Sequence, residues 1–77
     1  MNAMATSERL RAGQVFIDDE LLFWRVRAVA ESLDPEEVLV RIESGPSVSQ
    51  LNHLRVLVRT EFDELVREKD LLEIELN

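Results

Sequence analysis

The chain contains no cysteine, and this absence removes two common means of stabilising a small protein. Disulfide bonds are excluded, and so are zinc sites built from thiolates. A domain of 77 residues also has a small core, because a chain of this length buries only roughly 60% of the surface that its unfolded form exposes. Stability must therefore come from packing or from self-association.

Long apolar segments are missing as well. No apolar run approaches the roughly 18 residues that a membrane-spanning helix needs. Residues 1–12 also lack the apolar core of a secretory signal peptide. We therefore expect a cytoplasmic protein without a membrane anchor.

Residues suited to catalysis are scarce. His53 is the only histidine, and one imidazole without cysteine needs several carboxylates around it to hold zinc. Its neighbours Ser47 and Ser49 are explained more simply as turn or cap residues than as nucleophiles. Two carboxylate pairs, which lack the alternating oxygen ligands and the glycine of a calcium loop, are expected in turns: Asp18/Asp19 and Glu36/Glu37. We expect no enzymatic activity, no cofactor and no bound metal.

The net charge of −7 is unevenly distributed. Residues 1–30 are neutral overall, whereas residues 31–77 hold five basic and twelve acidic residues and hence the whole excess. An acidic total disfavours non-specific binding to nucleic acid through overall charge. Eight of the nine basic residues are arginine, the side chain suited to bidentate and stacked contacts. A negative net charge is still compatible with a local basic face.

Apolar and polar residues alternate with a period of two in five segments, and arginine fills the polar positions in three of them. The clearest run is Trp24-Arg25-Val26-Arg27-Ala28, and residues 37–43 and 54–59 follow the same rule. Successive side chains of a strand point to opposite faces. The pattern therefore predicts a sheet with one apolar face and one arginine-bearing face.

The turn, loop and cap residues between these segments complete the predicted order of secondary-structure elements. Residues 1–12 are predicted to be a flexible tail in which Thr6 or Ser7 could cap a helical turn over 8–12, and residues 13–77 a single domain. We expect strands at 14–17, 21–30, 37–43, 54–59 and 72–76, separated by an acidic turn at 18–20 and by loops that contain Pro35 and Gly45. Thr60 is expected to cap a helix over 61–68, before the last strand. The predicted fold is mostly β (α+β), a small five-stranded barrel with one short helix.

A helical interpretation is the alternative. Asp34-Pro35 is a good helix start, Gly45 before proline a good stop, and residues 47–50 form a capping box. Helical spacing then continues from 51 to 65. This predicts an all-α bundle, or a three-stranded sheet with one long helix over 47–68. We favour strands because valine and isoleucine occupy the alternating positions.

The predicted order resembles the small β-barrels of the Tudor and KOW kind. The resemblance covers residues 13–76 and rests on three segments: residues 13–16, Trp24-Arg25-Val26, and residues 62–66 before Leu72. It implies a docking module for peptides, nucleic acid or other subunits. The chain departs from such modules in having only four scattered aromatic residues and no tyrosine, which disfavours an aromatic cage.

The arginine-bearing face is the candidate interaction surface. Trp24, sharing its side of the strand with Val26 and Ala28, is expected in the core. Apolar side chains among the arginines are typical of a subunit interface, whereas pairing of the arginines with Glu37, Glu43, Glu73 and Glu75 would make an ordinary solvated face. The predicted surface comprises Phe23, Arg25, Arg27, Leu39, Arg41, Arg55, Leu57 and Arg59.

We therefore expect an interaction module with no small-molecule substrate. Its partner is another protein or a second copy of the chain, as a homodimer. Nucleic acid, bound through the arginine-bearing strands, is the second choice.

Overall fold

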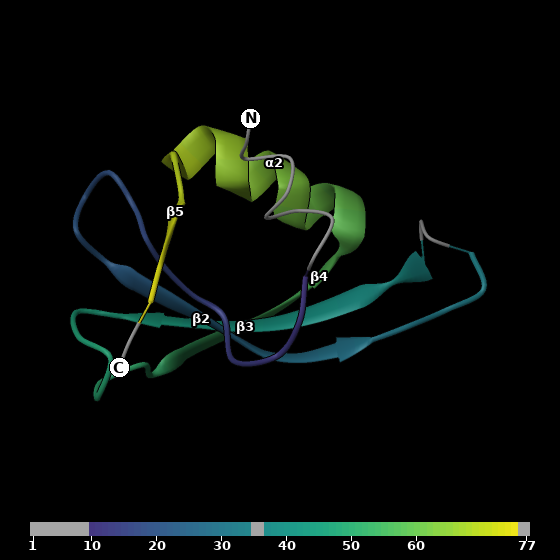
Figure 1. Cartoon of the computed structure of the whole chain (residues 1–77), viewed down its shortest axis with the longest axis horizontal. Coiled ribbons are helices and arrows are strands. Elements are labelled where there is room, and N and C mark those ends of the chain that lie inside the picture. The colour runs from purple at the N-terminus through teal and green to yellow at the C-terminus, as the bar shows by residue number, and fades with distance from the viewer. Residues whose placement is uncertain (1–9, 35–36, 76–77) are drawn as a thin grey trace.

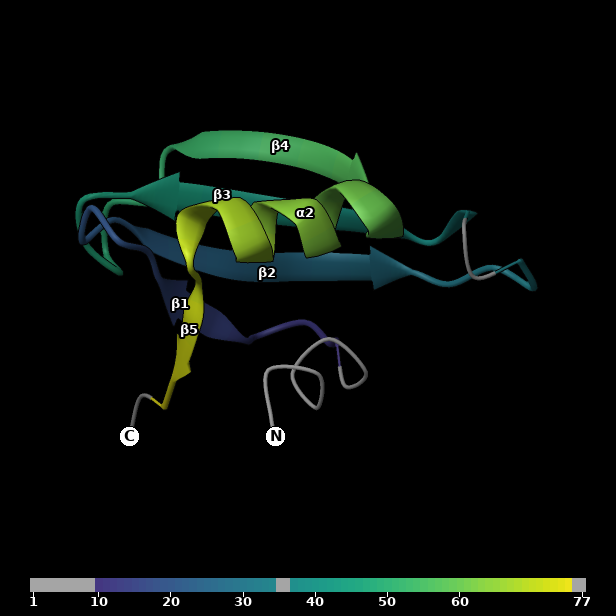
Figure 2. The ribbon, with the colours of Figure 1, turned by 90° about the horizontal axis from the view of Figure 1, so that it is seen from above.

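Five strands form a single antiparallel sheet in the computed structural model, which describes residues 10–34 and 37–75. Across the sheet the order is β4-β3-β2-β1-β5, so β4 and β5 are its edges. A helix lies against one face of the sheet, and no described helix lies on the other (Figure 1; Figure 2). The bounds are β1 Val15–Ile17, β2 Phe23–Ala30, β3 Leu39–Gly45, β4 His53–Val58, α2 Arg59–Lys69 and β5 Leu72–Ile74.

The mostly-β prediction, with one short helix before the last strand, is confirmed. The helical alternatives are wrong, because residues 53–58 form a strand paired with β3. The closed barrel is also wrong for the described residues, since the edge strands β4 and β5 do not pair with each other. Instead α2 covers one face and contributes Phe62 and Leu65 to the core.

The core lies between α2 and the sheet. Phe16, Trp24, Val26, Val40, Ile42 and Leu57 enter it from four strands, and each is at most 7% exposed. The rings of Phe16 and Phe62 meet edge to face, with centroids 6.0 Å apart and an interplanar angle of 65°. Strand alternation thus places every second residue of the central strands against the helix.

A bulge in β2 changes that alternation once. The register with β3 shifts between Val26 and Ala28, so Arg27 is the additional residue. Ala28, which the sequence placed in the core beside Trp24, pairs with Arg41 on the face away from α2. Val29 takes its place and packs against the core.

The helix begins two residues earlier than expected. Val58, not Thr60, is the N-cap residue, and its extended backbone has φ −76° and ψ 162°. The Glu61 carboxylate accepts a hydrogen bond of 3.1 Å from the Val58 N–H. Asp70 ends the helix in the left-handed conformation and donates its N–H to the Val66 carbonyl.

The N-terminal segment joins the fold before residue 13. Leu10, assigned to the tail from the sequence, packs against the core. The helical turn was expected over 8–12, and residues 8 and 9 lie outside the described part of the chain, as do the cap candidates Thr6 and Ser7. Residues 10–12 are described and are not helical. Among the described residues, no helix combines the length and apolar character needed to cross a membrane.

Candidate interaction surface

The face of the sheet away from α2, here called the open face, carries the candidate surface. Strand register defines its rows, because paired residues point to the same side. One row runs Arg25, Glu43, Leu54 from β2 to β4, and the next runs Ala28, Arg41, Val56. A third row runs Ala30, Leu39, Val58.

Exposed apolar side chains gather on this face at β3 and β4. Leu39 is 42% exposed, Leu54 50% and Val56 55%. The three lie on adjacent strands in neighbouring rows, and we call them the β4 patch. A contiguous group of exposed apolar residues is more informative than isolated ones, since it marks a surface suited to contact.

Three of the predicted arginines share the open face with this patch. Arg27 forms an ion pair of 3.4 Å with Glu43. Arg41 is exposed in the middle of β3, beside Val56 in the register. Arg25 is half-buried, and its Nε has no hydrogen-bond partner among the described residues. Phe23 lies on the same face, half-buried at the start of β2.

Three other predicted residues lie elsewhere. Leu57 is only 7% exposed and belongs to the core. Arg55, paired with the buried Ile42, points to the helix side of the sheet. Arg59 is the first residue of α2, where its Nε contacts the Asp63 carboxylate at 3.4 Å.

The differences at Arg55 and Leu57 have one cause, the phase of β4. Residues 56–58 of β4 are all apolar, so either set of side chains could face inward, and a shift of one residue exchanges the faces. The chain enters α2 directly after Val58, and Phe62 and Leu65 then meet Leu57 in the core. Leu54 and Val56, which the sequence assigned to the apolar side, are thereby turned outward.

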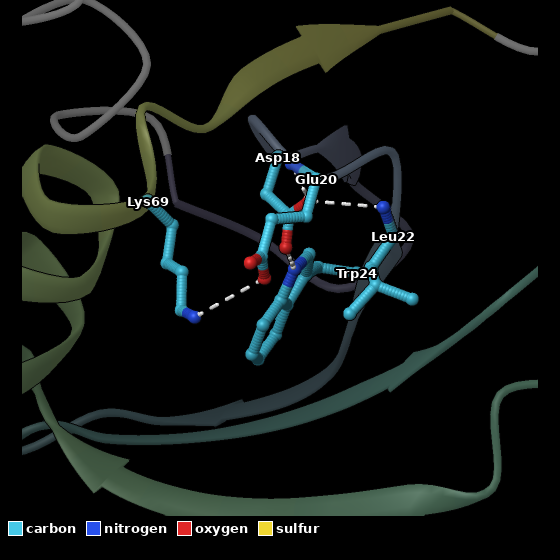
Figure 3. Close-up of polar contacts among 5 residues, drawn as sticks. All are labelled: Asp18, Glu20, Leu22, Trp24 and Lys69. Atoms are coloured by element: carbon cyan, nitrogen blue, oxygen red, sulfur yellow. Dashed lines mark hydrogen bonds and ion pairs between the residues drawn. The ribbon is translucent and has the colours of Figure 1, made fainter.

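The acidic turn between β1 and β2 brings three carboxylates close together. One carboxylate oxygen from each of Asp18, Asp19 and Glu20 lies within 4.8 Å of the others. Glu20 also contacts the Lys69 ammonium at 3.9 Å (Figure 3). The backbone N–H of Asp19 donates to the Lys69 carbonyl at 3.0 Å. The turn is therefore tied to the end of α2.

Asp18 itself is 4% exposed and is satisfied within the chain. Its Oδ1 accepts hydrogen bonds from the backbone N–H groups of Glu20 at 2.8 Å and Leu22 at 2.9 Å. Its Oδ2 accepts a 2.9 Å bond from Trp24 Nε1 (Figure 3). Burial raises the pKa of this carboxyl, but the three donors and the positive charge of Lys69 outweigh burial, and the pKa lies below its usual value. This arrangement explains Asp18 as an anchor of the turn.

The lone histidine lies at the start of a strand, outside the loop that holds Ser47 and Ser49. His53 is exposed at the start of β4 and pairs with Ser44 in the register. Ser47 and Ser49 are hydrogen-bonded to each other, Oγ to Oγ, at 3.1 Å. These contacts agree with turn roles for both serines.

A scan against protein-family models and searches of curated proteins and of solved structures found no match to this chain.

Proposed function

We propose that the protein is a non-enzymatic interaction module of the cytoplasm that associates with a second copy of itself through the open face. The observation that carries the proposal is the β4 patch: Leu39, Leu54 and Val56 are each at least 42% exposed on adjacent strands. Arginines border the patch on the same face. An apolar centre inside an arginine-rich surround is typical of protein interfaces.

A second copy suits this face for reasons of symmetry and size. A two-fold contact places the same patch on itself and leaves Arg27 and Arg41 at the rim. The principal extents of the molecule are 34 × 28 × 25 Å, so one face offers on the order of the 800 Å² per partner that a stable interface buries. Tudor and KOW modules also serve as docking modules, and the order of elements predicted from the sequence resembles theirs.

Light scattering at increasing concentration tests the proposal. We expect the mass to rise from 8.9 kDa toward twice that value, and to do so in high salt as well as low, because apolar burial is not screened. Val56→Lys should keep the protein monomeric, since it places a charge at the centre of the contact. Leu33→Lys is the matched control, because Leu33 is fully exposed in a loop away from the sheet. A wild-type protein that stays monomeric, or a Val56→Lys variant that still dimerises, would contradict the proposal.

Nucleic acid is the second candidate, favoured by one observation: Arg25, Arg27 and Arg41 share the open face. Adding a DNA duplex to the same experiment separates the two candidates. Binding through the arginines should weaken steeply with salt and be lost in Arg41→Glu. Val56→Lys would then strengthen binding to DNA, whereas it should abolish self-association. Affinity for DNA that is insensitive to salt would eliminate this candidate.

A further inference from the structure

The edge strand β4 presents unused backbone hydrogen-bonding groups. Of the described strands, only β3 pairs with it, and its other side faces away from the rest of the sheet (Figure 2). The Arg59 N–H donates to the Val38 carbonyl at 3.0 Å, one step beyond the β3–β4 register. Because hydrogen-bonded and non-bonded pairs alternate in an antiparallel ladder, Leu54 and Val56 direct their N–H and C=O groups away from β3.

The end of this edge confirms the direction of these groups. The Val58 N–H, in the same phase as Leu54 and Val56, is the one that donates to the Glu61 carboxylate at 3.1 Å. The helix thus closes the edge after Val56. Leu54 and Val56 remain with outward-facing backbone groups, and together they offer two donors and two acceptors.

A groove runs beside this edge on the helix side of the sheet. It has a volume of about 160 Å³ and lies between β4 and α2. Its apolar floor is buried, with Leu57 7% and Leu65 6% exposed. The full lining is Arg55, Leu57, Glu61, Glu64, Leu65 and Glu68.

The groove carries an excess of negative charge. Three carboxylates face a single guanidinium along its walls. Among the described residues, neither Glu64 nor Glu68 forms an ion pair, and Arg55 forms none either. A ligand that brings positive charge would therefore gain interactions that the chain does not make for itself.

We propose that an extended, basic segment of another protein adds to β4 as a sixth, antiparallel strand. Its backbone would pair with Leu54 and Val56, as in other cases of strand addition to a sheet edge. Alternate side chains would enter the groove, with lysine or arginine stems over Leu57 and Leu65 and their charges near the helix carboxylates. This use of the edge goes beyond self-association, which involves only the open face.

A second copy of β4 is a poor occupant of the same edge. Two-fold pairing of β4 with itself would place both α2 helices on the same face of a continuous sheet. The carboxylates of Glu61, Glu64 and Glu68 would then face their counterparts across the junction, between two chains of net charge −7 each. Like charges opposed in this way destabilise the pairing.

The probe is a short capped peptide, Lys-Val-Thr-Val-Lys. In antiparallel register its valines lie opposite Val56 and Leu54, its threonine opposite Arg55, and its lysines opposite Leu57 and His53. The valine N–H groups then point toward β4, whereas the threonine N–H points away. N-methylation of both valines should abolish binding, and N-methylation of the threonine, the matched control, should preserve it. Binding is followed by backbone NMR shifts and amide hydrogen exchange at low ionic strength.

We expect saturable binding of the lysine peptide, with exchange protection of the Leu54 and Val56 amides. Glu64→Lys should weaken it about fivefold or more, through loss of one exposed attraction and gain of one repulsion. Glu31→Lys changes the net charge equally but lies in the loop after β2, so it should weaken binding less than about twofold.

Several outcomes would overturn the inference. These are absence of binding, equal binding of a Glu-Val-Thr-Val-Glu peptide, or equal effects of the two N-methylated peptides. Concentration-dependent protection of Leu54 and Val56 without peptide would instead show that a second copy occupies the edge. That result would overturn this inference, whereas dimerisation that leaves these two amides unprotected would not.

Discussion

Replacement of Asp18 by asparagine should destabilise the protein by about 2–3 kcal/mol near neutral pH. The amide oxygen of asparagine can still accept the backbone bonds from Glu20 and Leu22, now 2.8 and 2.9 Å long. The amide nitrogen must then face the indole N–H of Trp24, where Oδ2 now accepts a bond of 2.9 Å. Two donors are opposed in a buried position, and one charge-assisted hydrogen bond is lost.

The same substitution should alter the dependence of stability on pH. The pKa of the Asp18 carboxyl in the folded protein lies below its usual value, which is about 3.9 in an unfolded chain. A carboxyl with a lowered folded-state pKa contributes stability above the unfolded pKa, and that contribution disappears as pH falls through the folded pKa. The free energies of unfolding of wild type and Asp18→Asn should therefore converge in acid.

Urea unfolding followed by far-ultraviolet circular dichroism, at dilute protein and several pH values, measures both effects. Trp24→Phe is the partner variant, since it removes the indole donor and leaves a smaller aromatic ring in its place, and it should cost about 1–3 kcal/mol. The double variant should cost less than the sum of the two single variants, because both remove one interaction. A loss below about 0.5 kcal/mol in Asp18→Asn, or a loss that stays constant into acid, would refute this account of Asp18.

Two further predictions concern packing. Gly45→Ala should destabilise the protein by about 2 kcal/mol or more in the same urea assay, because an added Cβ would overlap the backbone carbonyl oxygen of Gln50; unchanged stability would contradict this close approach. Leu57→Ala should cost about 2–5 kcal/mol, whereas Val56→Ala should change the monomer by less than about 1 kcal/mol, since the two side chains are 7% and 55% exposed. The opposite ranking would show that the phase of β4 is reversed.

Local pattern predicted the central part of the fold well. In β2 and β3 one phase of the alternation is clearly more apolar, and Trp24, Val26 and Ile42 point to the core. Composition also predicted the turn at 18–20 and the helix before the last strand. The bulge at Arg27 could not be predicted from the pattern, because the residues before and after an additional residue keep the same apolar or polar character.

Barrel closure and the phase of β4 were beyond local pattern for a different reason. Both depend on contacts between segments distant in sequence. In β4 one phase holds Leu54, Val56 and Val58 and the other holds Arg55 and Leu57, so composition favours the side that the structure turns outward. The position of α2 decides which side of β4 faces the core, because α2 covers Leu57. The sheet does not close, and β4 and β5 remain its edges.

The phase of β4 also explains why the two proposed surfaces occur together. Turning Leu57 inward turns Val56 outward onto the open face and carries Arg55 to the groove beside Glu64. Because these side chains lie on opposite sides of the sheet, the surfaces can be altered separately. We expect Val56→Lys to abolish self-association but to leave the weakening of peptide binding by Glu64→Lys intact, and Glu64→Lys to leave the mass in solution unchanged. Simultaneous loss of both properties in either variant would mean that one surface forms only when the other is occupied.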